Sequence, residues 1–187
     1  MRPFANLILT LLLCIPVAEI AQSKRPELPF FDWNACPFEG CSYRQWTAQK
    51  KVLVYDTWKH TRQEVAKLAA GQKVTAVTGV VITYKPGIIR MDRDLPERGL
   101  MRGDTILTYA YRGEGTSAAW VNGKYDPSFD ISFTKWPDGG GCQRDYCAAT
   151  YVDLGKKEWW AKIKLKSGQT GWVNMDTAEF GGVDVLG

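Results

Sequence analysis

The chain has 187 residues, of which 45% are hydrophobic and 24% are charged, and its formal net charge at pH 7 is +4. This mild basic excess is too small to indicate nucleic-acid binding, since no arginine-rich run or basic helical stripe accompanies it, but it suits an anionic cell wall or membrane surface. The 8 Trp, 8 Tyr and 7 Phe provide large side chains for the cores of compact β barrels.

Residues 1–23 are typical of a secretory signal peptide. Their apolar run, residues 7–17, is shorter than the roughly 20 residues that span a bilayer, and small residues follow where signal peptidase cleaves. We therefore expect an exported protein, periplasmic or extracellular, without a transmembrane segment once the signal is removed. The alternative is a lipoprotein anchored at Cys14, which would need a small residue in place of Leu13.

Four further cysteines form two hexapeptides, Cys36 to Cys41 and Cys142 to Cys147. An even number after an export signal favours disulfides, although four cysteines permit three pairings. Local pairing would stiffen two loops, whereas pairing between the hexapeptides would close one long loop. The rival interpretation is a four-cysteine zinc site, although the spacing lies at the edge of the zinc range. We expect disulfides, and neither a metal nor a cofactor.

Residues 24–50 are rich in proline and aromatic residues around the first cysteine pair, so we expect this segment to pack on the folded domain. Residues 51–99 are predicted to form a first β unit. Its expected strands are Val52–Tyr55, Val74–Tyr84 and Ile88–Met91, with residues 56–64 as a polar loop. The polar residues 92–99 form the predicted junction to the next unit.

Residues 100–187 are predicted to form a second β unit. Strands are expected at Thr105–Tyr111 and Ala118–Val121, and Asn122-Gly123 is a strong hairpin signal. Residues 126–150 contain several prolines and glycines and the second cysteine pair. We interpret them as a loop-rich insertion held by that pair.

The last hairpin is the clearest element. Residues 161–166 alternate between apolar side chains and lysines, which is typical of a strand with one buried and one solvated face. A glycine-containing turn follows, and Trp172-Val173 returns along the sheet. The same alternation places Trp159 on the inner face and Trp160 on the outer face with Lys162 and Lys164. That outer face is either open or covered by the insertion.

The order of an aromatic pair, an alternating strand, a polar turn and Gly171-Trp172-Val173 resembles the closing hairpin of bacterial Src-homology-3-like domains. The first cysteine pair, followed by Tyr43 and Trp46, resembles the N-terminal segment of an uncharacterised group of exported bacterial proteins with such folds. The resemblance implies an all-β fold of one or two small Src-homology-3-like barrels, in tandem or interlocked, with disulfide-held insertions. It also implies peptidoglycan or an envelope protein as the partner.

Catalytic chemistry has little support in the sequence. The chain has one histidine, His60, which lies in a polar stretch, and no Gly-x-Ser-x-Gly motif is present. We interpret His60 as a surface residue and expect no enzyme. A hydrolase would need paired carboxylates, and the candidates are Asp92, Asp94, Asp126 and Asp130.

An aromatic surface is the better candidate site, because flat rings bury extended peptides at small conformational cost. The candidate ligand-binding residues are Trp160, Lys162, Lys164, Tyr109, Tyr111 and Trp120. In this hypothesis the lysines meet carboxylates of a cell-wall peptide. The alternatives are that the rings fill barrel cores, or that the protein is an envelope assembly or inhibitor protein that binds another protein.

Overall fold

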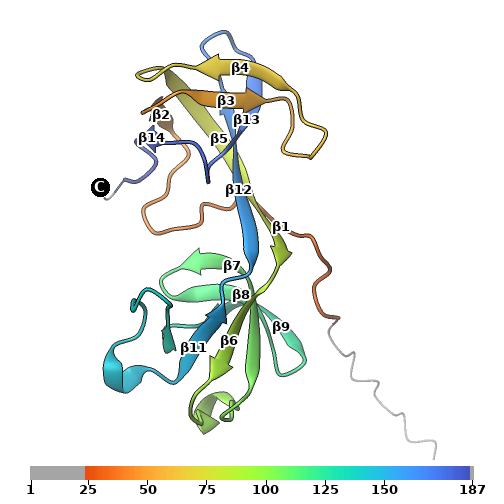
Figure 1. Ribbon diagram of the computed structural model, residues 1–187, viewed down its shortest axis with the longest axis vertical. Helices are drawn as coiled ribbons and strands as arrows, with labels where there is room; N and C mark the ends of the chain where they lie inside the picture. The colour runs from red at the N-terminus through yellow and green to blue at the C-terminus, as the bar shows by residue number, and fades with distance from the viewer. Residues whose placement is uncertain (1–23, 186–187) are drawn as a thin grey trace, which may run out of the picture.

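The computed structural model describes residues 24–185, so the predicted signal sequence lies outside the described residues. With 53% strand and 3% helix, the expected all-β class is confirmed. The strands form two curled sheets, one above the other in Figure 1, and the long strands β5 and β12 run between them.

The larger sheet contains β1 (Phe30–Trp33), β2 (Gln45–Ala48), β3 (Val52–Tyr55), β4 (Glu64–Leu68), β5 (Lys73–Lys85), β12 (Lys156–Lys164), β13 (Thr170–Asn174) and β14 (Phe180–Gly181). The smaller sheet contains β6 (Gly87–Met91), β7 (Thr105–Gly113), β8 (Thr116–Val121), β9 (Lys124–Asp130), β10 (Thr134–Lys135) and β11 (Ala149–Asp153). Two single-turn 3₁₀ helices, η1 (Pro96–Arg98) and η2 (Arg144–Tyr146), lie in loops.

The two sheets are nested in the sequence rather than consecutive. β5 and β12 pair from Lys85 with Lys156 to Thr75 with Lys164, and the smaller sheet is built from the chain between them. The expected units 51–99 and 100–187 therefore do not coincide with the sheets. The predicted junction at residues 92–99 connects β6 to β7, which pair within one sheet. Pairing between strands far apart in the sequence decides this division, and local patterns carry no information on it.

Each sheet curls around its own apolar core. The larger sheet buries Trp46, Val52, Val54, Leu68, Val74, Ala161, Ile163 and Val173, among others. The smaller sheet buries Ile89, Met91, Leu100, Ile106, Ile131, Phe133 and Tyr151, among others. The expected alternation in β12 is confirmed on the inner side, because Ala161 and Ile163 point into the core of the larger sheet.

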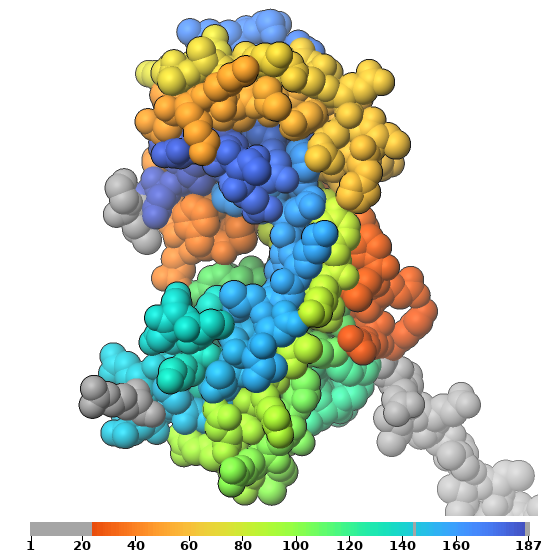
Figure 2. Space-filling view, in the orientation of Figure 1, coloured from red at the N-terminus to blue at the C-terminus, as the bar shows by residue number. Residues whose placement is uncertain are grey.

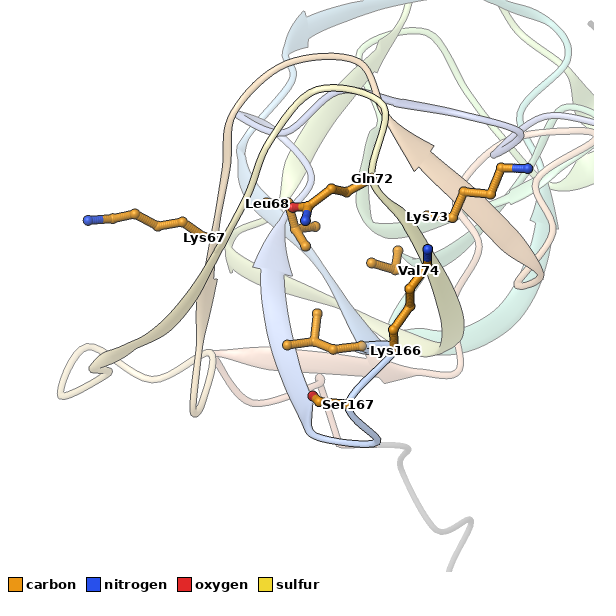
Figure 3. A pocket seen from close by; sticks show the side chains of 8 residues that line it. Lys67, Leu68, Gln72, Lys73, Val74, Lys166 and Ser167 are labelled. Atoms are coloured by element: carbon orange, nitrogen blue, oxygen red, sulfur yellow. The ribbon is translucent and has the colours of Figure 1, made fainter.

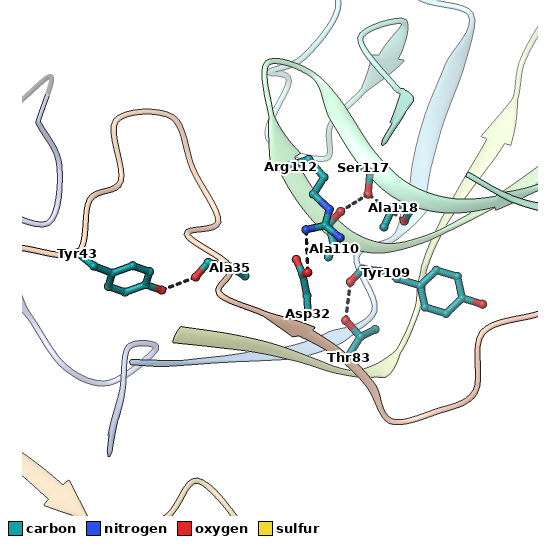
Figure 4. A network of polar contacts seen from close by, with 9 residues as sticks. All are labelled: Asp32, Ala35, Tyr43, Thr83, Tyr109, Ala110, Arg112, Ser117 and Ala118. Atoms are coloured by element: carbon teal, nitrogen blue, oxygen red, sulfur yellow. Dashed lines mark hydrogen bonds and ion pairs between the residues drawn. The ribbon is translucent and has the colours of Figure 1, made fainter. Parts of the chain in front are cut away.

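Polar contacts join the sheets where β1 and β5 approach β7 (Figure 4). Asp32 of β1 forms an ion pair with Arg112 of β7, with 2.7 Å between Oδ1 and Nη1. Thr83 of β5 donates a hydrogen bond to the carbonyl oxygen of Tyr109. The space-filling view narrows between the two sheets (Figure 2). These contacts therefore connect the two sheets across the narrow region between them.

Both cysteine pairs form local disulfides, Cys36–Cys41 and Cys142–Cys147, so disulfide formation is confirmed and one of the three possible pairings is selected. The zinc interpretation is wrong for these cysteines, because their sulfur atoms are bonded to each other. Within residues 24–185, no helix has the length and apolar character needed to cross a membrane.

Candidate functional site

The outer face of the larger sheet carries a row of aromatic residues. Strand register aligns Trp33 of β1, Val80 of β5 and Trp160 of β12 across three neighbouring strands. Trp159 packs on the opposite side against the core, as alternation predicts. Trp160 therefore lies on the predicted face. That face is not open, however, because Trp160 is 0% exposed.

The cover over Trp160 is the loop between β3 and β4, residues 56–63. Two hydrogen bonds close the base of this loop: Asp56 N donates to Gln63 O over 3.0 Å, and Gln63 N donates to Asp56 Oδ1 over 2.8 Å. The guanidinium of Arg62 then lies 5.1 Å from the Trp160 ring centroid and 5.3 Å from that of Tyr55. These are cation–π distances, so Arg62 stabilises the loop on the sheet.

The same loop places Trp58 against the aromatic residues of β1. Its ring centroid lies 5.2 Å from that of Phe31 and 6.1 Å from that of Trp33. Phe31 and Trp33 stack on each other with an interplanar angle of 15°. Trp33 is 53% exposed, so part of this aromatic cluster remains on the surface.

A pocket opens beside Arg62, and we refer to it as the Arg62 pocket. Its volume is about 340 Å³, and its lining residues are Lys51, Val52, Leu53, Tyr55, Arg62, Trp160, Asn174, Thr177 and Ala178. Two of these residues are cationic, Lys51 and Arg62, and none is acidic. Neither cation forms an ion pair with a carboxylate within residues 24–185. The pocket therefore offers one partly exposed aromatic side chain, Tyr55, and two cations without an ion pair among the described residues.

The Trp160 indole N–H and the Tyr84 hydroxyl share one carboxylate oxygen. Trp160 Nε1 donates to Glu158 Oε2 over 3.0 Å, and the Tyr84 hydroxyl donates to the same oxygen over 3.4 Å. Burial raises the pKa of Tyr84, and the negative charge of Glu158 adds to this effect. The indole N–H is thus already bonded, and Trp160 is 0% exposed, so it contributes to the pocket through its contact with Arg62.

The other candidate binding residues do not gather around Trp160. Lys162 shares its face and pairs with Trp172 across the β12–β13 ladder, whereas Lys164 is exposed at the end of β12. Tyr109 is buried in the smaller sheet beside Trp120. The expected single surface of all six residues is therefore not formed.

A β-bulge separates two of these tyrosines. The pairing of β7 with β8 shifts between Thr108 and Ala110, so Tyr109 is the additional residue. As a result Tyr109 packs on one side of the sheet and Tyr111 packs on the other, against the main core of the smaller sheet. Alternation in the sequence predicts that Tyr109 and Tyr111 lie on the same face of β7. Because of the bulge, they lie on opposite faces.

Sequence reasoning missed Arg62 and Trp58 because they lie in a stretch that is polar by composition. One signal was present: Trp58 is a large aromatic residue within an otherwise polar loop, and such a residue needs an apolar surface to pack on. Only the fold shows that this surface is the outer side of β1, β5 and β12.

A second hollow lies at the end of the larger sheet, between the β4–β5 turn and the β12–β13 hairpin (Figure 3). Its volume is about 210 Å³, and three lysines line it. The ammonium groups of Lys67 and Lys73 point away from the hollow, and Lys67 also pairs with Glu64 at 3.0 Å. Only Lys166 extends across the opening, so this site concentrates less charge than the Arg62 pocket.

The four candidate carboxylates of a hydrolase bond to local partners. Asp92 accepts from the Thr150 hydroxyl, Asp94 from the backbone of Arg102, Asp126 from the backbone of Ser128, and Asp130 from Ser132 and Arg98. Burial alone would raise the pKa of Asp130, but the hydrogen bonds from Ser132 and Arg98 hold it below its usual value. A depressed pKa is the reverse of what a general acid needs.

No protein-family model, curated protein or solved structure matches this chain. Within residues 24–185, no group of three or more histidine, cysteine, aspartate or glutamate side chains is placed to hold a metal ion. The Arg62 pocket is therefore the feature of the described residues that best indicates a function.

Proposed function

We propose that this protein is an exported, non-enzymatic binding module of the cell envelope that recognises peptidoglycan through its peptide carboxylates. In this proposal the larger sheet is a small Src-homology-3-like barrel, and the smaller sheet is inserted between its strands β5 and β12. Two disulfides and the signal-like residues 1–23 support export.

The observation that carries the proposal is the position of Arg62. Its guanidinium lies within cation–π distance of Tyr55 and Trp160 yet has no carboxylate partner in an ion pair among the described residues. An arginine held within cation–π distance of aromatic rings keeps N–H donors with which a carboxylate can form two hydrogen bonds. Lys51 lines the same pocket and adds positive charge. The pocket thus suits an extended peptide with a free carboxylate.

The test is retention on purified peptidoglycan sacculi. We expect the unmodified protein to be retained and Arg62→Gln to bind about tenfold more weakly, since a charged hydrogen bond contributes roughly 1.5 kcal/mol. Arg102→Gln is the matched control, because Arg102 is an exposed residue of the turn before β7 and the change in net charge is the same. Equal retention of the two variants would contradict the role of Arg62, and no retention of the unmodified protein would exclude the cell-wall ligand.

One observation favours the alternative of an envelope assembly or inhibitor protein. The Cys142–Cys147 ring carries Tyr146, which is 76% exposed. A tyrosine presented on a short covalent ring is typical of a protein contact site, because little conformational entropy is lost on binding. Co-purification of a stoichiometric partner that is lost in Tyr146→Ser, but kept in Arg62→Gln, would support this function instead.

A further inference from the structure

A separate pocket lies in the smaller sheet, and we refer to it as the Glu114 pocket. Its volume is about 400 Å³, and its lining residues are Tyr111, Glu114, Gly115, Ile131, Ser132, Trp136 and Gly141. Two aromatic walls, Tyr111 and Trp136, meet edge to face with 6.3 Å between their centroids and an angle of 87° between their planes. The pocket combines these walls with one carboxylate.

The tyrosine wall is fixed by hydrogen bonds. The Tyr111 hydroxyl accepts from Gly115 N over 3.1 Å and donates to Glu39 Oε1 over 3.4 Å. The same glutamate oxygen accepts from Glu114 N over 2.8 Å. The turn that carries Glu114 is therefore held in place through its backbone, while no hydrogen bond to its carboxylate is found among the described residues.

The tryptophan wall is fixed by packing. The Trp136 ring lies 4.9 Å from that of Tyr151, centroid to centroid. Gly141 has a φ of +86°, and a Cβ there would lie 2.3 Å from Trp136 Cδ1. Gly141 thus permits the close approach of the indole to the backbone, so the wall is formed before any ligand arrives.

The charge in this pocket is negative. Its lining contains no basic residue. The nearest cation in the sequence, Arg112, is already paired with Asp32, and Arg98 is paired with Asp130. Neither Glu114 nor the neighbouring Glu39 forms an ion pair within residues 24–185. An acidic hollow is complementary to a cation.

We propose that the Glu114 pocket binds the primary ammonium group of a peptide side chain. The ammonium would lie against the faces of Tyr111 and Trp136, where the ring quadrupoles attract a cation, and would donate a hydrogen bond to the Glu114 carboxylate. Ser132 supplies a further hydroxyl oxygen at the rim. This site lies in the other sheet from Arg62 and does not depend on the proposed function.

The test is an NMR titration of the full protein with Nα-acetyl-lysine methylamide, with Nα,Nε-diacetyl-lysine methylamide as the uncharged probe. We expect the first probe to shift the Trp136 indole N–H and the Gly115 amide, and the second to shift them about fivefold more weakly or not at all. Glu114→Gln should weaken binding of the charged probe by about fivefold, the effect of losing one exposed ion pair.

The matched control is Glu97→Gln, which removes an exposed carboxylate of η1, in the loop between β6 and β7, and should leave the affinity unchanged. Glu114→Gln is expected to fold, because no contact of its carboxylate is lost, and an unchanged spectrum in the absence of probe verifies this. Equal binding of both probes, equal binding by Glu114→Gln and Glu97→Gln, or no shift at the pocket would each overturn the proposal.

Discussion

Asp32 has a carboxylate that is almost removed from water. Its side chain is 6% exposed, Oδ1 contacts Arg112, and Oδ2 has no hydrogen-bond partner among the described residues. Burial raises the pKa of Asp32, and the Arg112 guanidinium opposes that rise with a smaller effect. A buried ion pair is weak support for stability by itself, but the removal of one partner leaves a charge without compensation.

We therefore predict that Arg112→Met lowers the free energy of unfolding by about 2–4 kcal/mol. This loss is slightly smaller than the loss on breaking a fully buried ion pair, because the arginine side chain is 35% exposed. The double variant Asp32→Asn/Arg112→Met should recover most of this loss. Urea unfolding at pH 7 measures both. A double variant no more stable than Arg112→Met would show that the uncompensated carboxylate is not the cause.

The raised pKa of Asp32 also predicts a pH dependence. The folded protein holds the Asp32 proton at higher pH than the unfolded chain does. The contribution of this group to the free energy of unfolding is therefore largest below its ordinary pKa of about 4 and is lost as pH rises through the raised value. Comparing unfolding curves of the unmodified protein and Asp32→Asn from acid to neutral pH isolates this slope. Parallel curves would contradict the shift.

At the scale of elements, β5 depends on a glycine where another segment crosses it. A Cβ on Gly79 would lie 2.0 Å from the Tyr43 hydroxyl oxygen and 3.0 Å from the carbonyl oxygen of Ala35. The Tyr43 hydroxyl donates to Ala35 O and accepts from Trp159 Nε1 over 3.3 Å. Gly79 thus permits the N-terminal segment to lie directly on the strand.

We predict that Gly79→Ala destabilises the protein by about 1–3 kcal/mol, because the added methyl displaces the Tyr43 hydroxyl and its hydrogen bonds. Tyr43→Phe removes the oxygen that the methyl meets, so in that background Gly79→Ala should have a clearly smaller effect. Thermal unfolding of the four proteins completes the double-mutant cycle. Additive effects would mean that another contact limits the space at Gly79.

For the whole molecule, the nested arrangement has a consequence for folding. Lys85 is the last residue of β5 and Lys156 is the first residue of β12. The two residues pair in the β5–β12 ladder, although 70 residues lie between them in the sequence. The ends of the smaller sheet thus meet at one point, as do the chain ends of a tolerated domain insertion. The larger sheet has its own core and is expected to fold without the inserted residues.

We predict that replacing residues 86–155 by Asn-Gly, which closes a two-residue hairpin between Lys85 and Lys156, gives a protein that unfolds cooperatively. Dispersed NMR signals and a sigmoidal urea transition are the expected results. A fragment of residues 51–99 is the contrast: it should be unfolded, because it lacks the β12 and β13 partners of its strands. A disordered shortened protein would show that the core of the larger sheet depends on contacts with the smaller one.

The sequence by itself determined part of the local structure of this protein, namely several of its strands and one hairpin turn. Alternation predicts the strands around Val54, Ile106 and Ile163, because a half-buried strand must present every second side chain to the core. Turn chemistry is local in the same way: Asn122 and Gly123 have φ values of 49° and 73°, as a two-residue hairpin requires. The disulfide chemistry also followed from the number of cysteines, although the pairing did not.

Only the tertiary structure decided which of these elements meet. The pairing of β5 with β12, the bulge at Tyr109 and the loop that places Arg62 over Trp160 depend on contacts between residues far apart in the chain. Alternation along β12 assigned Trp160 to the correct face of the strand. Whether Trp160 is exposed depended on the loop of residues 56–63, which is far from it in the sequence. Periodicity reports which side of a strand a residue occupies, whereas burial depends on what packs against that side.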